Sequence, residues 1–191
     1  MRKRHELDAY DTSTKLVEVL VEKVLNKYAE KTDIILEPCA GKRYIIDQLW
    51  RNGYDEILEW DIDETLPNIA TIKDASIYDC LYENSVDWVV TNPPYMQPTC
   101  QQIIENSMRY ARKGICMLLR LTYDEPCANR AEFLKNTQMT HQLIFNPRPK
   151  FRTDTSGTDS ATTCWFVWMR PEFISEKNLI NTEKMYITNW N

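Results

Sequence analysis

Residues 86–95 read VDWVVTNPPY, an apolar run that ends in an amide, two prolines and an aromatic ring. The run Val86–Thr91 has the length and apolar character of a buried strand, and Asn92-Pro93-Pro94-Tyr95 follows it directly. In open α/β sheets, ligands bind at the carboxyl ends of the strands. We therefore expect a ligand site at the end of this strand.

The four residues after the strand offer two hydrogen-bond acceptors and a flat ring. The side-chain oxygen of Asn92 and the carbonyl of Pro93 both accept hydrogen bonds, and the prolines fix the backbone between them. Two convergent acceptors suit an exocyclic NH2 group, and a base can stack on Tyr95, a contact worth about 1–3 kcal/mol. The alternative is a Pro-Pro turn capped by Asn92, with Tyr95 in the core.

Strand and helix patterns alternate along the rest of the chain. Short apolar runs predict strands at Ile34–Leu36, Glu56–Ile62, Ala70–Lys73, Val86–Thr91, Ile115–Leu119, Gln142–Phe145 and Thr162–Trp168. Apolar residues at helical spacing predict helices, the third of them closed by Gly114, at Leu16–Lys27, Tyr44–Asn52, Gln101–Arg112 and Glu125–Asn136. This alternation predicts an α/β fold with a parallel sheet and helices on both faces. The last two strands are joined without a helix, which predicts an antiparallel edge.

Length and composition narrow the class of protein. A chain of 191 residues with 43% hydrophobic content is expected to form a single domain over residues 1–191, with no role assigned to residues 170–191. The net charge of -5 argues against a generally basic surface for nucleic acid, although a local basic patch could still bind phosphates. No apolar run approaches the roughly 20 residues of a membrane span, and no signal peptide is visible. We expect a soluble, cytoplasmic protein.

The cysteines and histidines do not predict a metal site. The six cysteines stand singly along the chain, and there are only two histidines. A structural zinc site needs clustered ligands, so we expect no metal and interpret the cysteines as free thiols in a reducing compartment.

Further polar residues follow the other predicted strands. Residues 37–41 read EPCAG, where Gly41 can adopt a positive φ and allow close approach to the backbone. Asp61 lies at the tip of the second strand, a position suited to binding the hydroxyls of a ribose, and Asp74 follows the third. If each feature is considered alone, the alternative interpretation is a plain strand-to-helix turn at Gly41 and solvent-exposed loop charges at Asp61 and Asp74. Their order along the chain favours a nucleotide-type ligand.

Taken in series, these segments resemble the class I S-adenosylmethionine-dependent methyltransferases, specifically the small phage and bacterial enzymes that methylate N6 of adenine in DNA. The early matches are EPCAG at 37–41, DID at 61–63, Asp74 and DWVVTNPPY at 87–95. The late ones are RPKF at 148–151, DS at 159–160 and WFVW at 165–168, and YDT at 10–12 is similar to the family's N-terminal segment. The resemblance covers about residues 8 to 170.

This resemblance implies a fold, an activity and a set of site residues. The fold would be Rossmann-like, a mostly parallel seven-stranded sheet with an antiparallel C-terminal edge hairpin. The substrate would be DNA with its target adenine flipped out of the duplex, because the reacting atom is otherwise inaccessible. In the catalytic motif, Asn92 and Pro93 would hold the adenine amino group beside Pro94, while Tyr95 stacks on the base. The other implied contacts are Tyr10, Thr12, Glu37, Gly41, Asp61, Asp74 and Asn92 for the cofactor S-adenosylmethionine, and Phe151, Arg148, Lys150 and Arg152 for DNA.

Within these implied contacts, Glu37 and Gly41 would lie near the methionine part of the cofactor, Asp61 at its ribose and Asp74 at its adenine. Tyr10 and Thr12 would lie near its carboxylate. Phe151 would close on the second face of the base, the alternative being a buried hairpin residue. The three cations from Arg148 to Arg152 would contact phosphates, or form an ordinary charged loop.

The chain departs from the family pattern at the glycine turn. A second glycine is usual two residues after the first, and here Lys42 and Arg43 follow Gly41. Two cations at this turn could crowd the sulfonium of the cofactor or neutralise its carboxylate. The alternative functions are methylation of ribosomal RNA bases, methylation of protein glutamine, and binding of nucleic acid by a catalytically inactive relative. The oligomeric state and the DNA sequence recognised are not predicted.

Overall fold

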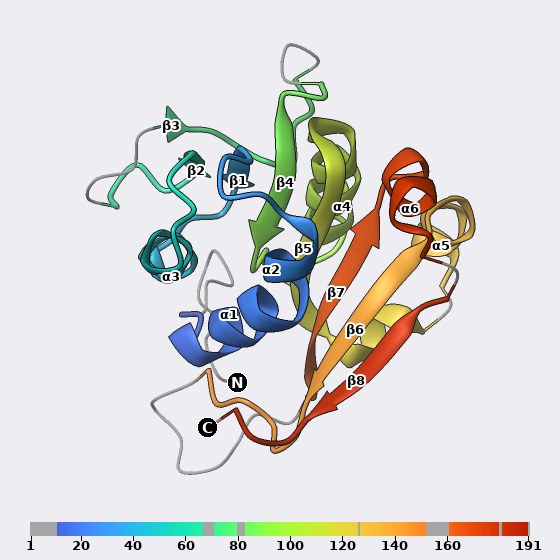
Figure 1. The fold of residues 1–191 in the computed structure, drawn as a ribbon. Coiled ribbons are helices and arrows are strands. Elements are labelled where there is room, and N and C mark those ends of the chain that lie inside the picture. The colour runs from blue at the N-terminus through green and yellow to red at the C-terminus, as the bar shows by residue number, and fades with distance from the viewer. Residues whose placement is uncertain are drawn as a thin grey trace, which may run out of the picture.

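The computed structural model describes residues 11–66, 71–79, 83–125, 127–151, 161–179 and 181–190. They form an eight-stranded sheet in the order β3-β2-β1-β4-β5-β7-β6-β8, with helices on both faces (Figure 1). Strand β7 runs antiparallel to both of its neighbours, and the other pairs are parallel. The predicted α/β class, mostly parallel with antiparallel pairing near the C-terminus, is confirmed.

All seven predicted strands are present, with small shifts at their ends. The first half of the chain contains α1 (Thr14–Leu20), the π-helical segment η1 (Val21–Leu25), α2 (Asn26–Tyr28), β1 (Ile35–Glu37), α3 (Tyr44–Arg51), β2 (Ile57–Asp61), β3 (Thr71–Ile72) and β4 (Val86–Thr91). The second half contains α4 (Thr99–Tyr110), β5 (Ala111–Arg120), the 3-10 helices η3 (Leu121–Asp124) and η4 (Ala128–Arg130), α5 (Ala131–Asn136), β6 (Met139–Phe145), β7 (Thr163–Met169), α6 (Pro171–Lys177) and β8 (Glu183–Ile187).

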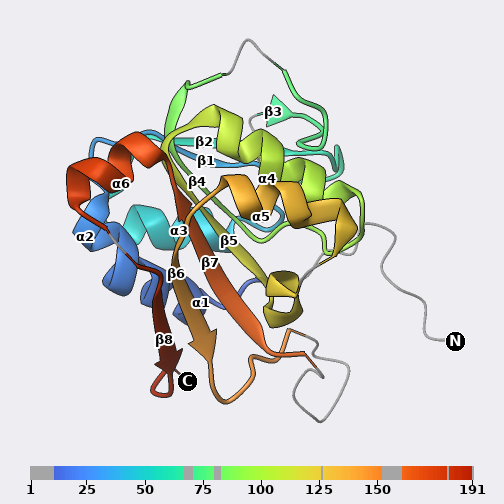
Figure 2. The same ribbon diagram turned by 90° about the vertical axis from the view of Figure 1, so that its right-hand side faces the viewer.

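Two hydrophobic cores flank the sheet. One joins the sheet to α1, α3 and α6 and contains Leu20, Ile45 and Ile174. The other lies beneath α4 and α5 and contains Ile104 and Phe133. Figure 2 shows the two helical layers on opposite faces of the sheet. None of the described helices combines the length and apolar composition needed to cross a bilayer.

The prediction that Gly114 closes a helix is wrong. Helix α4 already ends at Tyr110, and β5 begins at the next residue, so that Gly114 lies within the strand. A Cβ atom at Gly114 would stand 2.5 Å from the carbonyl oxygen of Trp168 and 3.0 Å from the ring of Trp88. The glycine is therefore required by the close approach of β5 to its neighbours, a use that a sequence pattern does not distinguish from a helix end.

Residues 171–179 and 181–190 belong to the fold. Helix α6 buries Phe173 and Ile174, and β8 pairs in parallel with β6 at the edge of the sheet. The sheet therefore has eight strands rather than seven, and the pair β6–β7 lies one strand inside the edge. The pattern of β8 is weak because four of its five residues are exposed or half-buried, and only Ile187 is buried.

Candidate functional site

The end of β4 carries a chain of hydrogen bonds that includes the predicted acceptor residue. The side-chain amide nitrogen of Asn92 donates to the hydroxyl of Thr12 over 3.1 Å. The Tyr95 hydroxyl donates to the side-chain oxygen of Asn92 over 2.9 Å. These bonds fix the orientation of the Asn92 amide, and an amide oxygen can accept a second hydrogen bond. The structure thus brings together Thr12, Asn92 and Tyr95 from the sequence prediction.

Arg120 adds a cation to this end of the site that the sequence analysis missed. Its guanidinium lies over the Tyr95 ring, 5.4 Å from the ring centroid. Arg120 is the last residue of β5, and β5 pairs in parallel with β4. The position of an arginine at the end of the next strand along the sheet was a signal that could have identified it.

The glycine turn after β1 is joined directly to the end of β2. Gly41 has a φ of 50°, and its N–H donates to one carboxylate oxygen of Asp61 over 2.8 Å. The other oxygen of Asp61 accepts the N–H of Asp63 over 2.9 Å. Asp61 is buried. Through these two hydrogen bonds its carboxylate joins the turn after β1 to the residues that follow β2. Gly41, predicted to lie near the methionine part of the cofactor, and Asp61, predicted to lie at its ribose, are therefore in direct contact.

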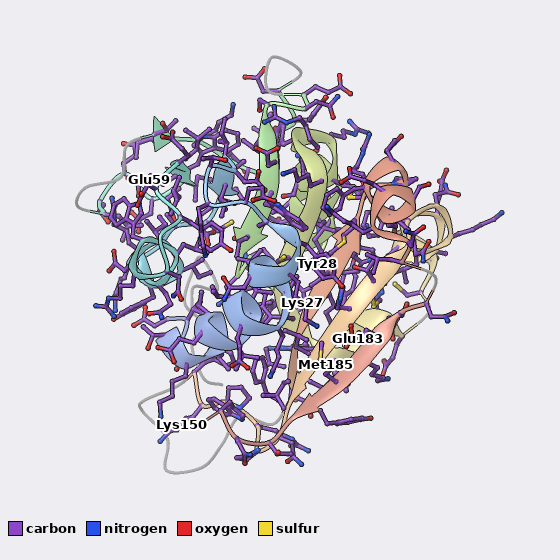
Figure 3. All side chains as sticks on the ribbon, viewed as in Figure 1. Lys27, Tyr28, Glu59, Lys150, Glu183 and Met185 are labelled. Carbon is purple, nitrogen blue, oxygen red and sulfur yellow. The ribbon has the colours of Figure 1, made fainter. Side chains whose placement is uncertain are left out.

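Arg43, which stands at the position of the second glycine, and its neighbour Lys42 are both paired with acidic residues. Arg43 adopts a φ of 67° and reaches Glu59 on β2 with an N–O distance of 2.7 Å, and its guanidinium lies 4.9 Å from the centroid of the Trp50 ring. Lys42 forms an ion pair of 2.8 Å with Asp11. Figure 3 shows Glu59 on the side of the molecule that carries β2, across from Glu183 and Met185 on the edge strand β8. The charge of Arg43 is thus offset within the protein.

Glu37 is a buried acid at the end of β1. Its Oε1 atom accepts the N–H of Cys39 over 3.0 Å, whereas its Oε2 atom accepts no hydrogen bond from the described residues. Burial raises the pKa of Glu37 to about 8 and the negative charge of Asp61 adds to the increase, whereas the nearby Thr91 hydroxyl and the N–H of Cys39 oppose it. A buried carboxyl oxygen without a partner is costly and is expected to bind a cation or a donor.

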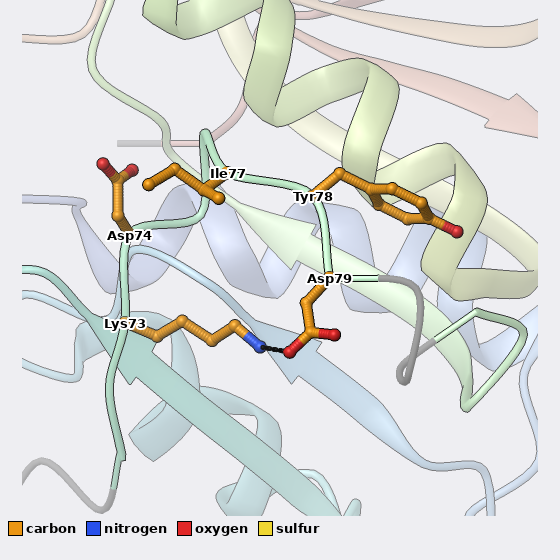
Figure 4. A pocket seen from close by; sticks show the side chains of 5 residues that line it. All are labelled: Lys73, Asp74, Ile77, Tyr78 and Asp79. Atoms are coloured by element: carbon orange, nitrogen blue, oxygen red, sulfur yellow. Dashed lines mark hydrogen bonds and ion pairs between the residues drawn. The ribbon is translucent and has the colours of Figure 1, made fainter.

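A cavity of about 370 Å³ lies beyond β3 and is lined by Lys73, Asp74, Ile77, Tyr78 and Asp79 (Figure 4). Lys73 spans it to Asp79 with an N–O distance of 3.2 Å. The Oδ1 atom of Asp74 accepts hydrogen bonds from the N–H and the hydroxyl of Ser76, at 2.9 and 2.6 Å. The N–H of Lys73 donates to the carbonyl of Asp61 over 2.8 Å, so the cavity begins next to the end of β2. Asp74 therefore lies in a hollow adjoining Asp61.

The residues predicted to contact DNA differ in their surroundings. Phe151 is half-buried and packs against the hydrophobic core on the α1 side of the sheet. Arg148 and Lys150 are exposed, and Figure 3 places Lys150 on the loop after β6, at the edge of the sheet toward which β4 points. Tyr10 and Arg152 lie outside the described residues.

Comparison with known proteins identifies similar folds and no close relative. No family model matches the chain, and no curated protein matches its sequence. A Listeria monocytogenes protein assigned to the class I S-adenosylmethionine-dependent methyltransferases is similar in structure, with a TM-score of 0.67, 14% identity and alignment over 96% of this chain and 67% of that one.

Two other similar structures are named for particular reactions. The M protein of the type I restriction enzyme EcoKI has a TM-score of 0.61 at 12% identity, over 85% of this chain and 44% of that protein. Magnesium protoporphyrin IX methyltransferase from Synechocystis, solved with bound S-adenosylmethionine, has a TM-score of 0.59 at 11% identity, over 82% of this chain and 79% of that enzyme. At these identities the likeness shows the fold, which is that of the class I methyltransferases.

Proposed function

We propose that this chain is an S-adenosylmethionine-dependent methyltransferase whose target is the N6 amino group of adenine in DNA. The observation that carries the proposal is the hydrogen-bonded chain Thr12–Asn92–Tyr95 at the end of β4. It presents an oriented amide oxygen and an aromatic ring at the carboxyl end of β4. In α/β sheets, ligands bind at the carboxyl ends of the strands.

The residues at the ends of β1, β2 and β3 fit the proposed cofactor. The unpartnered Oε2 atom of Glu37 is suited to the ammonium group of the methionine part. Asp61 and Asp74 follow as acceptors for ribose hydroxyls and an adenine amino group, and Asp74 lies on a cavity. When bound, S-adenosylmethionine supplies an electrophilic methyl group.

The residues of the chain position the acceptor. The second lone pair of the Asn92 oxygen and the carbonyl of Pro93 would accept the two hydrogens of the adenine amino group. The Tyr95 hydroxyl holds the Asn92 amide in the orientation that this requires, because it donates to the same oxygen. Stacking on the Tyr95 ring would fix the plane of the base. Such prepositioning is a large part of what a site can contribute to group transfer.

A nucleic-acid base is favoured over a protein glutamine by two features. The Tyr95 ring is a stacking surface for a base, and the guanidinium of Arg120 beside it favours a polyanionic substrate over a neutral glutamine side chain. Similarity to the M protein of a restriction enzyme supports the same target. The chain spans less than half of that protein, so recognition of a DNA sequence would be a property of further segments or of loops such as 146–161.

The experiment that tests this proposal offers several substrates to the purified protein. Cofactor labelled in its methyl group would be incubated separately with DNA, ribosomal RNA and a protein with an exposed glutamine. We expect label in DNA only. Label confined to RNA or to protein would replace the proposed substrate, and no binding of the cofactor by the folded protein in calorimetry would favour an inactive relative.

A further inference from the structure

Arg120 differs from the other arginines near the strand ends in what it contacts. Its side chain is half-buried and lies over the Tyr95 ring, yet it forms no hydrogen bond and no ion pair with the described residues. By contrast, Arg43 is paired with Glu59, and Arg130 donates to the carbonyls of Thr122 and Glu125. The polar N–H groups of Arg120 are therefore available to a ligand.

The backbone on both sides of Arg120 is held rigidly. Arg120 pairs with Thr163 of β7, and the N–H of Leu121 donates to the carbonyl of Thr162 over 2.8 Å. The 3-10 helix η3 that follows is fixed from two directions. The Tyr123 hydroxyl donates to Gln101 over 2.7 Å, and Gln142 donates to Asp124 over 2.8 Å. A cation on such a support is preorganised rather than carried on a mobile loop.

The position of the Arg120 guanidinium relative to the Tyr95 ring limits which groups of a ligand the guanidinium can contact. An aromatic ring has two faces, and the guanidinium lies over one of them, so a base would stack on the other. The phosphates of a stacked nucleotide flank its sugar, at the periphery of the ring rather than above its centre. A planar guanidinium with several N–H donors matches a phosphodiester oxygen pair.

Resting on the proposed function, we infer that Arg120 is a substrate-binding residue that contacts a backbone phosphate of the polynucleotide whose base stacks on Tyr95. The net charge of the chain is -5, so the protein as a whole repels a polyanion. A fixed cation at the acceptor end offsets that repulsion at the place where the base must enter. The contact carries no sequence information and serves to position the strand.

The test compares Arg120→Ala with Arg51→Ala, which removes an exposed arginine from the end of α3. Binding of fluorescent single-stranded and duplex oligodeoxynucleotides, and of an oligoribonucleotide of the same sequence, is measured by anisotropy across a salt series. We expect Arg120→Ala to weaken binding about tenfold and to reduce the slope of log K against log salt by about one. Arg51→Ala is expected to change neither quantity. Arg120→Lys should recover the slope and part of the affinity, because it keeps the charge and loses the planar fork.

The outcomes separate this inference from the proposed function. Calorimetry with S-adenosylmethionine should give equal affinities for wild type and Arg120→Ala, which shows that the fold is intact; if that variant does not fold, Arg120→Gln takes its place. Unchanged oligonucleotide affinity and salt slope in Arg120→Ala would overturn the role of Arg120 and leave the methyltransferase proposal standing. A loss seen with RNA, in a protein that does not bind DNA, would support Arg120 and overturn the DNA target. Binding of no oligonucleotide by the wild type would overturn both.

Discussion

Asn92 is held at both ends of its amide before any substrate arrives. Thr12 accepts from its nitrogen and Tyr95 donates to its oxygen, so rotation of the amide would break two hydrogen bonds. Each neutral hydrogen bond of this kind contributes about 1 kcal/mol to a fixed arrangement. The acceptor group is therefore oriented by the protein rather than by the ligand.

The two roles of Tyr95 can be separated by substitution. Tyr95→Phe keeps the ring and removes the hydroxyl that orients Asn92, so we expect kcat/KM for DNA to fall about fivefold to tenfold. Tyr95→Ala removes the stacking surface as well, and we expect a loss of about 100-fold. Steady-state transfer of labelled methyl groups measures both. Equal activities for the two variants would contradict a stacking role for the ring.

Glu37 makes the stability of the ligand-free protein depend on pH. Its pKa is about 8 in the folded protein against an ordinary value of 4.5, so between these values the folded state binds a proton that the unfolded state has lost. The free energy of unfolding should therefore fall as the pH rises from about 5 to about 8. Glu37→Gln cannot ionise, and we expect it to flatten this part of the curve. Urea denaturation at about pH 5.5 and about pH 8 measures the effect. A decline of equal size in both proteins would show that other groups cause it.

At the scale of the element, the turn between β1 and α3 carries an ion pair formed by Arg43, at the position where the family usually has a second glycine. Arg43 is the N-cap residue of α3 and lies in the left-handed region of φ, a conformation that favours glycine. Its side chain then binds Glu59, and the two side chains are 18% and 11% exposed. The pair ties the start of α3 to β2 and holds the turn on which Gly41 lies.

Removal of Arg43 should lower the free energy of unfolding, because the Glu59 carboxylate would remain largely buried without a cation. Arg43→Ala leaves the Glu59 carboxylate largely buried without its cation, and we expect the free energy of unfolding to fall by about 2 kcal/mol. The double variant Arg43→Ala with Glu59→Gln removes the isolated charge and should recover part of that loss. Chemical denaturation of wild type, the two single variants and the double variant gives the coupling energy. A coupling energy near zero would contradict the structural role of the pair.

Strands whose residues are nearly all buried were easier to predict from the sequence than a strand that is stabilised mainly by backbone pairing with its neighbour. The run Val86–Thr91 was placed correctly at both ends because it is apolar and short. β8 was missed because four of its five residues are exposed or half-buried, Tyr186 among them with 67% exposure, so the strand exists through backbone pairing with β6. Gly114 was misread because its function depends on Trp168, a residue far along the chain.

The candidate site was predictable to a similar extent. The order of motifs predicted Gly41, Asp61 and Asn92 as site residues, and the structure places Asp61 and Asn92 at the ends of β2 and β4 and Gly41 in the turn after β1. Spacing could not show that Tyr95 binds Asn92 or that Arg43 is paired with Glu59, because these contacts depend on side-chain directions in three dimensions.

For the whole molecule, the C-terminal residues complete the sheet and one core. Phe173 packs edge-on against Trp88, with ring centroids 5.7 Å apart, and Trp190 donates to the carbonyl of Pro147 over 3.1 Å. Removal of these residues would expose the edge of β6 and the apolar surface beneath α6. Exposed strand edges promote association between chains.

A chain that ends at Arg170 should therefore be less stable and should self-associate. We expect a lower Tm than that of the full chain, with larger species in size-exclusion chromatography. A chain that ends at Thr188 retains β8 and serves as the control, because the contacts of the described residues that it loses include those of Trp190 and none that pair β8 with β6. A monomeric product of the shorter truncation with an unchanged Tm would contradict the assignment of α6 and β8 to the fold.

The most direct test of the proposed activity is the position of the transferred methyl group. DNA is incubated with the protein and S-adenosylmethionine, digested to nucleosides and analysed by mass spectrometry, in parallel with Asn92→Ala and with Asn136→Ala, which changes an exposed asparagine on α5. We expect N6-methyladenine from the wild type and Asn136→Ala, and about 100-fold less from Asn92→Ala with cofactor binding retained. Methylation at another atom, or equal N6-methyladenine from Asn92→Ala, would contradict the proposed role of the site at the end of β4.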